Sequence, residues 1–191
     1  MNLVPSRGYL ELIIGPMFSG KTTHVIQKYK QHVLVDHKVA VINSIGDTRY
    51  SNSQLSTHDK TMIDCIFSST LEPLRTNKEV QEANVLIINE GQFFPDIHTF
   101  VMDMVEEEAK VVYVCGLDSD FRRERFGTLL DLIPYADNIV KLKSMCMSCC
   151  DGTPALFSWR VTNDTDQVVI GSDNYRPLCR RCYLDVTRLQ S

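Results

Sequence analysis

The chain has 191 residues and 43% of them are hydrophobic, enough for one substantial domain or a core domain with a small appendage. Its formal net charge is −4 and its acidic and basic residues are interspersed, which disfavours a dedicated nucleic-acid-binding protein. Residues 1–8 lack the long apolar stretch of a signal peptide, and no segment reaches the roughly 20 apolar residues that span a bilayer. We therefore expect a cytoplasmic protein that binds neither nucleic acid nor membrane.

Short apolar runs follow one another along the first three quarters of the chain. The first, residues 9–14, ends at a glycine and is followed by apolar positions at helical spacing over residues 21–34, which predicts strand, loop and helix. Further strands are predicted at residues 38–45, 85–89, 111–115 and 138–142, with helical sequence such as 97–109 between them. Because these runs do not alternate with polar residues, we expect an α/β fold with a parallel sheet covered by helices on both faces.

The character of the sequence changes at Ser144, after which cysteine pairs, glycine, proline and a polar stretch at residues 162–167 take over. We expect two parts: a nucleotide-binding α/β domain over residues 1–143 and a small ribbon-like zinc subdomain with a substrate-binding loop over residues 144–191.

Residues 15–22 match the phosphate-binding pattern GxxxxGK[ST] and lie between the first predicted strand and helix, as the mechanism of such a loop requires. Its amide groups can surround nucleotide phosphates, the lysine adds a positive charge, and the threonine hydroxyl can bind magnesium. The predicted ATP-binding residues are Gly15, Pro16, Met17, Phe18, Ser19, Gly20, Lys21 and Thr22. A chance glycine turn with a solvated lysine is the alternative.

Cys146 and Cys149 form one CxxC pair and Cys179 and Cys182 a second, and 29 residues separate the two pairs. Two such pairs predict tetrahedral coordination of zinc, and four thiolate ligands leave no position for a catalytic water, so the metal should be structural. A redox dithiol pair and unrelated buried cysteines are the alternatives.

Several further segments occur in the order found in the cellular-type (type II) thymidine kinases, which the chain resembles over about residues 8–184. They are Gly15 to Lys21, Asp47-Thr48-Arg49-Tyr50, Thr57-His58-Asp59, Glu90 to Ile97, Leu117-Asp118, Phe121, Phe126-Gly127, Val140 to Leu142 and the two cysteine pairs. The resemblance implies transfer of phosphate from ATP to the 5′-hydroxyl of thymidine, with deoxyuridine as a second acceptor.

Phosphoryl transfer to a hydroxyl needs a base, and Glu90 follows an apolar strand at the edge where the phosphate loop should lie. By resemblance Glu90 is the catalytic base. Lys21 and Arg49 are candidates for stabilising the transition state, and Asp47 for orienting Arg49 or magnesium-bound water. An exposed loop ion pair is the alternative for Asp47 and Arg49.

The resemblance also implies a nucleoside pocket in which side chains pack on the base and loop backbone meets its polar edge. The implied packing residues are Met17, Phe93, Leu117, Phe121, Phe126 and Tyr175. The implied backbone residues are Gln167, Val168, Val169, Ile170 and Gly171. Each apolar residue could instead belong to the core. The chain departs from the family pattern by having Ser172 in place of a second glycine, with one residue fewer before Tyr175.

A second departure is Asn89, where the family has aspartate; with Thr22, it is the candidate for holding magnesium. Two other functions therefore stay open: an ATPase of the helicase kind, and a catalytically impaired zinc-ribbon module that binds nucleotide. The resemblance further implies a homotetramer and feedback inhibition by thymidine triphosphate.

Overall fold

A computed structural model describes residues 7–45, 54–56, 62–169 and 171–189. Its centre is a six-stranded sheet in the order β5-β2-β6-β7-β1-β8, with every neighbouring pair parallel. The strands are β1 (Tyr9–Ile14), β2 (Val39–Ser44), β5 (Ile66–Ser68), β6 (Val85–Asn89), β7 (Val111–Gly116) and β8 (Asn138–Lys141). The expected parallel α/β sheet is thereby confirmed.

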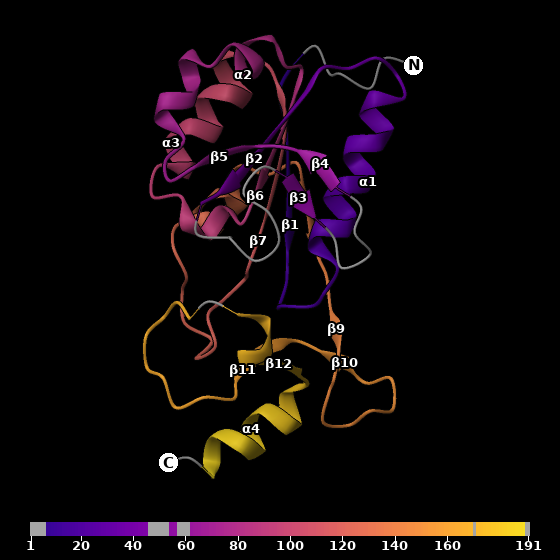
Figure 1. Ribbon diagram of the computed structural model, residues 1–191, viewed down its shortest axis with the longest axis vertical. Coiled ribbons are helices and arrows are strands. Elements are labelled where there is room, and N and C mark those ends of the chain that lie inside the picture. Colours follow the sequence, from indigo (N-terminus) through magenta and orange to yellow (C-terminus); the bar gives the residue numbers. More distant parts are fainter. Residues whose placement is uncertain (1–6, 46–53, 57–61, 170, 190–191) are drawn as a thin grey trace.

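Helices cover both faces of this sheet, as the apolar strands require (Figure 1). On one face α1 (Lys21–Val33) buries Val25 and Ile26 against the strands. On the other, α2 (Lys78–Glu82) and α3 (Ile97–Met102) pack with the 3₁₀ segment Leu129–Tyr135. After α3 the chain continues as a π-helical turn, Asp103–Glu107, within the range predicted as one helix.

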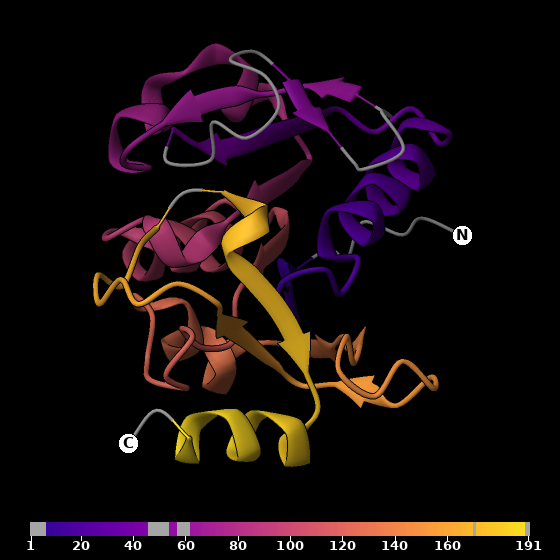
Figure 2. The same ribbon diagram turned by 60° about the horizontal axis from the view of Figure 1, so that its bottom comes forward.

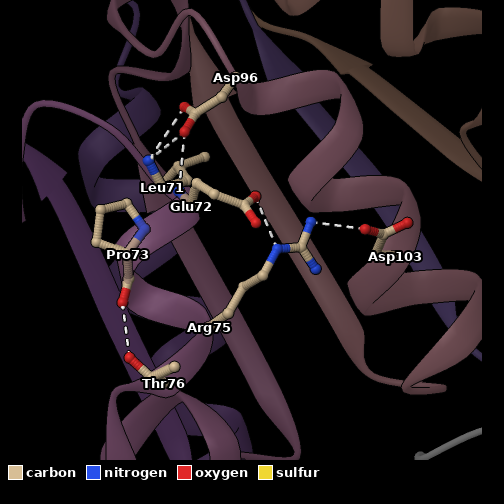
Figure 3. Close-up of polar contacts among 7 residues, drawn as sticks. All are labelled: Leu71, Glu72, Pro73, Arg75, Thr76, Asp96 and Asp103. Carbon is tan, nitrogen blue, oxygen red and sulfur yellow. Dashed lines mark hydrogen bonds and ion pairs between the residues drawn. The ribbon is translucent and has the colours of Figure 1, made fainter.

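Polar contacts attach the 3₁₀ segment Glu72–Thr76 to α3 (Figure 3). The Asp96 carboxylate accepts hydrogen bonds from the backbone amides of Leu71 and Glu72. Arg75 donates to both Glu72 and Asp103, at 2.7 and 2.6 Å. Asp96, which belongs to the segment Glu90 to Ile97, thus caps a neighbouring helix in this structure.

The C-terminal part has its own small core and lies at one end of the molecule (Figure 1). Two short antiparallel pairs build it, β9 (Ser144–Met145) with β10 (Pro154–Ala155) and β11 (Phe157–Arg160) with β12 (Tyr175–Leu178). The helix α4 (Arg180–Arg188), which the sequence analysis did not predict, packs on β11 and β12. Its Tyr183 joins the buried group Cys146, Ala155, Leu178 and Cys179.

A further antiparallel pair, β3 (Gln54–Ser56) with β4 (Met62–Asp64), precedes β5. These strands and β5 were not predicted, because each is only three residues long. None of the helices in the described ranges is long and apolar enough to cross a membrane.

Candidate active site

The phosphate-binding loop joins the carboxyl end of β1 to the N-terminus of α1, on the side of the sheet that faces β11 and β12 (Figure 1). Gly15 is required because a Cβ there would lie 2.6 Å from the carbonyl oxygen of Leu142. Gly20 begins the helix with a φ of 82°, in the left-handed region that favours glycine. The Lys21 ammonium is buried and donates to the carbonyl oxygens of Gly15 and Pro16, at 3.1 and 2.8 Å.

Two further features of this loop concern Ser19 and Met17. The Ser19 hydroxyl is buried and has no hydrogen-bond partner among the described residues, so a phosphate oxygen could serve as one. The amide of Met17 donates to the Ser158 hydroxyl of β11 at 2.9 Å, which ties the loop to the C-terminal part. A 670 Å³ cavity beside Phe18 is also lined by residues 143–145, 147, 172, 173 and 175–177.

Glu90 follows β6, which is separated from β1 by β7 in the sheet. It lies at the same edge of the sheet as the phosphate loop, because the carboxyl ends of parallel strands are on one side. It is buried and has a left-handed φ of 53°, an uncommon conformation for a residue with a Cβ. Gln92 donates to its carboxylate at 2.6 Å and accepts from the Leu117 amide at 3.0 Å. Gln92 therefore fixes the carboxylate of Glu90 relative to the segment that follows β7.

Asn89 is buried at the end of β6, beside Asn43 of β2. Its amide group donates to the Asn43 side-chain oxygen at 3.0 Å, and its own oxygen lies 3.2 Å from the Cys115 sulfur as an acceptor. The position predicted to hold magnesium is thus part of an uncharged buried network joining three neighbouring strands.

Two of the predicted nucleoside-packing rings contact each other directly. Phe93 and Phe126 meet edge to face, with centroids 5.3 Å apart. Leu117, which is bonded through its amide to Gln92, is half-buried at the end of β7. These residues therefore gather near Glu90.

The segment 118–127, which carries Phe121, is tied to the loop between β11 and β12. Gln167 donates to the buried carboxylate of Asp120 and to the Arg125 carbonyl, both at 3.1 Å. Asp120 also accepts from the backbone amides of Arg122 and Glu124, which closes the turn around Phe121. Tyr183 of α4 donates to the Phe121 carbonyl at 2.7 Å.

The loop between β11 and β12 is visible as the long connection beside β12 in Figure 2. Tyr175, the first residue of β12, donates through its hydroxyl to the Val169 carbonyl at 3.1 Å. Gly171 has a φ of 119° and leads into a 3₁₀ turn, Ser172–Asn174, which is where the chain departs from the family pattern. Val168 is exposed, which is compatible with the predicted role for backbone rather than side chain.

Arg160 lies behind this loop and donates to several of its carbonyl groups. Arg160, Gln92, Asp120 and Ser158 were not predicted as site residues. Gln92 could have been predicted, because it is a polar residue two positions after the predicted base and is followed by the apolar residues Phe93 and Phe94. Asp120 and Ser158 gain their roles from contacts with residues 47 and 141 positions away, which no local pattern predicts. Arg160 gains its role from bonds to loop carbonyl groups.

The four paired cysteines meet in space. Their sulfur atoms all lie within 4.8 Å of one another, and Cys149 is 3.4 Å from Cys182 and 3.8 Å from Cys179. A tetrahedron with zinc–sulfur bonds of ~2.3 Å has sulfur–sulfur edges of about 3.8 Å, so these residues fit the metal. Cys150 is exposed and contacts the Met147 carbonyl instead.

The electrostatics of the cluster also suit a cation. Burial opposes ionisation of Cys146, but backbone amides of Cys179, Cys149 and Ser148 lower its pKa to about 6. Contacts with the thiols of Cys182, Cys146 and Cys179 raise the pKa of Cys149 to about 12. Four thiolates this close repel one another, and a divalent metal removes that repulsion.

Three predicted site residues, Asp47, Arg49 and Ile170, lie outside the described ranges. Apart from the four cysteines, the remaining predicted residues occupy two adjoining groups, one around Glu90 and the phosphate loop and one around Phe121 and the loop before β12. The bonds of Gln167 to Asp120 and of Met17 to Ser158 connect the two parts of the chain.

Comparisons with known proteins show the family of this chain. The family model described as "Thymidine kinase" matches residues 8–183. A thymidine kinase of Myxoma virus (strain Uriarra) is 40% identical over 177 residues, covering 92% of this chain and 96% of the relative. The vaccinia virus (strain Western Reserve) thymidine kinase is 38% identical, covering 93% and 98%. A cytosolic thymidine kinase of Cricetulus griseus is 37% identical, covering 97% and 77%. The chain belongs to the thymidine kinase family.

Proposed function

We propose that this protein transfers the γ-phosphoryl group of ATP to the 5′-hydroxyl of thymidine, giving thymidine monophosphate and ADP, and that deoxyuridine is a second acceptor. The observation that carries the proposal is the family match over residues 8–183 together with the phosphate loop and Glu90 at one edge of the sheet. An ATPase or an inactive nucleotide-binding module is not favoured by these relatives.

In the proposed reaction the carboxylate of Glu90 takes the proton of the 5′-hydroxyl group. The oxygen of that hydroxyl group forms a bond to the γ-phosphorus. The bond from that phosphorus to the bridging oxygen breaks, and ADP leaves. Gln92 holds the carboxylate in place, since one end of its amide bonds Glu90 and the other bonds the backbone at Leu117.

The phosphates of ATP are bound by the amides of residues 15–22, and the Lys21 ammonium moves from the Gly15 and Pro16 carbonyls to the β and γ oxygens. The cavity beside Phe18 has room for the adenosine part. Arg49 adds a second positive charge and Asp47 orients it. Magnesium, when bound, would neutralise charge on the phosphates. Thr22 and Asn89 are the residues that would hold it.

The thymine base is packed by Met17, Phe93, Leu117, Phe121, Phe126 and Tyr175, and backbone groups of residues 167–171 meet its edge. The four cysteines would hold a structural zinc. Because they lie in the segment that follows the sheet and at the N-terminus of α4, the metal would tie together both ends of the part that carries the nucleoside loop.

The test is ADP formation with purified protein, ATP and magnesium, with and without thymidine. We expect release that depends on thymidine, less with deoxyuridine, and little with deoxycytidine or purine deoxynucleosides. ADP release that is indifferent to nucleoside would identify an ATPase instead, and nucleotide binding without turnover would identify the inactive module.

We also propose, from the family resemblance, a homotetramer, inhibition by thymidine triphosphate at the nucleoside site, and a cytoplasmic location. The name of the Cricetulus relative supports the last of these. The division at residues 143 and 144 is supported by the separate buried groups on its two sides. Light scattering and inhibition kinetics test the first two proposals.

A further inference from the structure

We propose that Arg160 is a positioning residue for the nucleoside site: it holds the loop between β11 and β12, and the ring of Phe121, in the arrangement that thymidine needs. The inference rests on the proposed function, because it assigns the residue that organises the pocket already described. It starts from a difficulty in the loop itself. Residues 162–168 are exposed and belong to no helix or strand, so their backbone groups lack the regular partners that fix a conformation.

Arg160 supplies those partners from a single side chain. One nitrogen of its guanidinium group donates to the carbonyls of Asp164 and Asp166, and the other donates to the Gln167 carbonyl at 3.0 Å. The second nitrogen also donates to the Tyr175 hydroxyl at 2.6 Å. That hydroxyl in turn donates to the Val169 carbonyl. Four loop residues are therefore held, directly or through Tyr175, by one residue of β11.

The same group lies against the nucleoside-packing rings. The guanidinium carbon is 3.8 Å from the centroid of Phe121 and 5.1 Å from that of Tyr175. A planar cation at this distance is attracted to the face of an aromatic ring and restricts its orientation. Arg160 thus joins a side chain that packs on the base to the backbone that meets the base's edge.

The burial of Arg160 argues against a role in stability alone. Its side chain is 2% exposed and forms no ion pair with a carboxylate of the described residues. Its Nε is buried without a described hydrogen-bond partner. Burying a cation with no described carboxylate beside it, and with only carbonyl dipoles, the Tyr175 hydroxyl and ring faces as described partners, is costly. An apolar side chain would fill the space with less penalty. A guanidinium here is explained if the ordered loop is needed for binding.

The chain provides a matched control in Arg122. It is also an arginine, its guanidinium carbon lies 4.8 Å from the Phe121 ring, and it donates to a loop carbonyl, that of Thr165. It differs from Arg160 in being exposed and in holding, among the described loop residues, that one carbonyl alone. Comparing the two therefore isolates the effect of the buried, multiple contact.

The experiment measures KM and kcat for thymidine and for ATP in the wild type, Arg160→Lys and Arg122→Lys. Lysine keeps the charge but cannot direct a rigid set of donors to several carbonyls at once. We expect Arg160→Lys to raise the thymidine KM about tenfold or more, or about 1.4 kcal/mol, while the ATP KM changes less than about twofold. Arg122→Lys should change both values less than about twofold.

Zinc content and Tm are measured for each variant, so that unfolding is separated from loss of the loop. Arg160→Ala leaves a space that ethylguanidinium can fill. Added at millimolar concentration, this compound should lower the raised thymidine KM of Arg160→Ala and leave the thymidine KM of Arg122→Ala unchanged. The proposal is overturned if Arg160→Lys leaves the thymidine KM within twofold, if both KM values rise together, or if Arg122→Lys has an equal effect.

A second measurement does not depend on turnover. A protease that cleaves beside aspartate should cut the loop at Asp164 and Asp166 faster in Arg160→Lys than in the wild type or Arg122→Lys. The proposed function would be refuted if the wild-type protein released no ADP in response to thymidine. Faster cleavage of Arg160→Lys than of the wild type would, even then, identify Arg160 as the residue that holds the loop. Equal cleavage in all three proteins would refute the role of Arg160 even in an active kinase.

Discussion

The sheet region and the cysteine-held region differ in what keeps them folded. The sheet is covered on both faces, and its strands contribute fully buried residues such as Leu12, Ile42, Ile87 and Val114 to two core layers. The C-terminal region has a buried group of only five residues, two of which are Cys146 and Cys179. Apolar burial scales with size, so a region this small needs a cross-link, and the cysteine cluster fits a metal that provides one.

This difference divides the proposed site as well. The phosphate loop is built on β1 and α1 and is fixed by the sheet, whereas the loop before β12 is held by Arg160 and belongs to the region that carries the cysteine cluster. Damage to the first region should therefore change turnover, and damage to the second should change affinity for nucleoside. The following experiments test that separation, beginning with the largest expected effect.

Glu90→Gln should reduce kcat by about 10²- to 10⁴-fold, because the amide keeps the shape of the side chain but cannot take the proton. Thymidine should bind nearly as well as to the wild type. Steady-state turnover and calorimetric titration with thymidine measure the two quantities. A variant that kept more than half of the wild-type kcat would show that Glu90 is not the base.

Removal of zinc, or Cys179→Ser, should raise the KM for thymidine by about tenfold, a change of about 1.4 kcal/mol, and the KM for ATP much less. The exposed Cys150 supplies a matched control, since Cys150→Ser should alter neither value nor the zinc content. Equal changes in both KM values after verified loss of metal would contradict the separation of the two regions.

Asn89→Asp should lower the magnesium concentration needed for half-maximal activity by about two- to fivefold, since a charged acceptor binds a metal-held water more strongly. The plateau should be similar or higher. The buried contact with Asn43 moderates the gain: a carboxylate would face the Asn43 oxygen unless the Asn43 amide turns. Activity measured against magnesium in both proteins tests this, and an inactive wild type at every concentration would mark the chain as a nucleotide-binding module.

The smallest effect concerns pH and is confined to the sheet region. His32 of α1 is buried, with its ring nitrogens 2.9 Å from those of His37 and from the Tyr113 hydroxyl. Burial, followed by the charges of His37 and Lys28, lowers its pKa below the ordinary value of 6.5. The unfolded chain therefore takes up this proton first, so stability falls as the pH drops below about 6.5 and is independent of this group above it.

His32→Gln should remove part of that dependence. Tm measured from pH 7.5 to 5.5 at constant zinc should fall less steeply in the variant than in the wild type. Identical slopes of Tm against pH would mean that His32 is not the responsible group. A steeper slope in the variant would mean that His32 stabilises the folded protein as the pH falls, the opposite of the prediction.

Elements with strong local signals were predicted from the amino-acid sequence. The strands at residues 9–14 and 85–89 were predicted with their observed bounds, and the helix after the phosphate loop ends one residue earlier than predicted. Continuous apolar runs identify covered strands, and the glycines and lysine of residues 15–21 identify a phosphate loop, because the chemistry depends on neighbouring residues. The paired cysteines likewise predicted a cluster that the structure brings together.

The side chains that support the site could be identified only in the folded chain. The bonds of Gln92 to Leu117, Ser158 to Met17 and Gln167 to Asp120 join residues 25, 141 and 47 positions apart. Arg160 was undistinguished in the sequence, since one arginine in a short strand is usually exposed. Arg160 contacts the loop and the Phe121 ring only because β11 places it next to both in the folded chain. A hydrogen bond depends on distance in space, and folding creates those distances between residues that the sequence keeps apart.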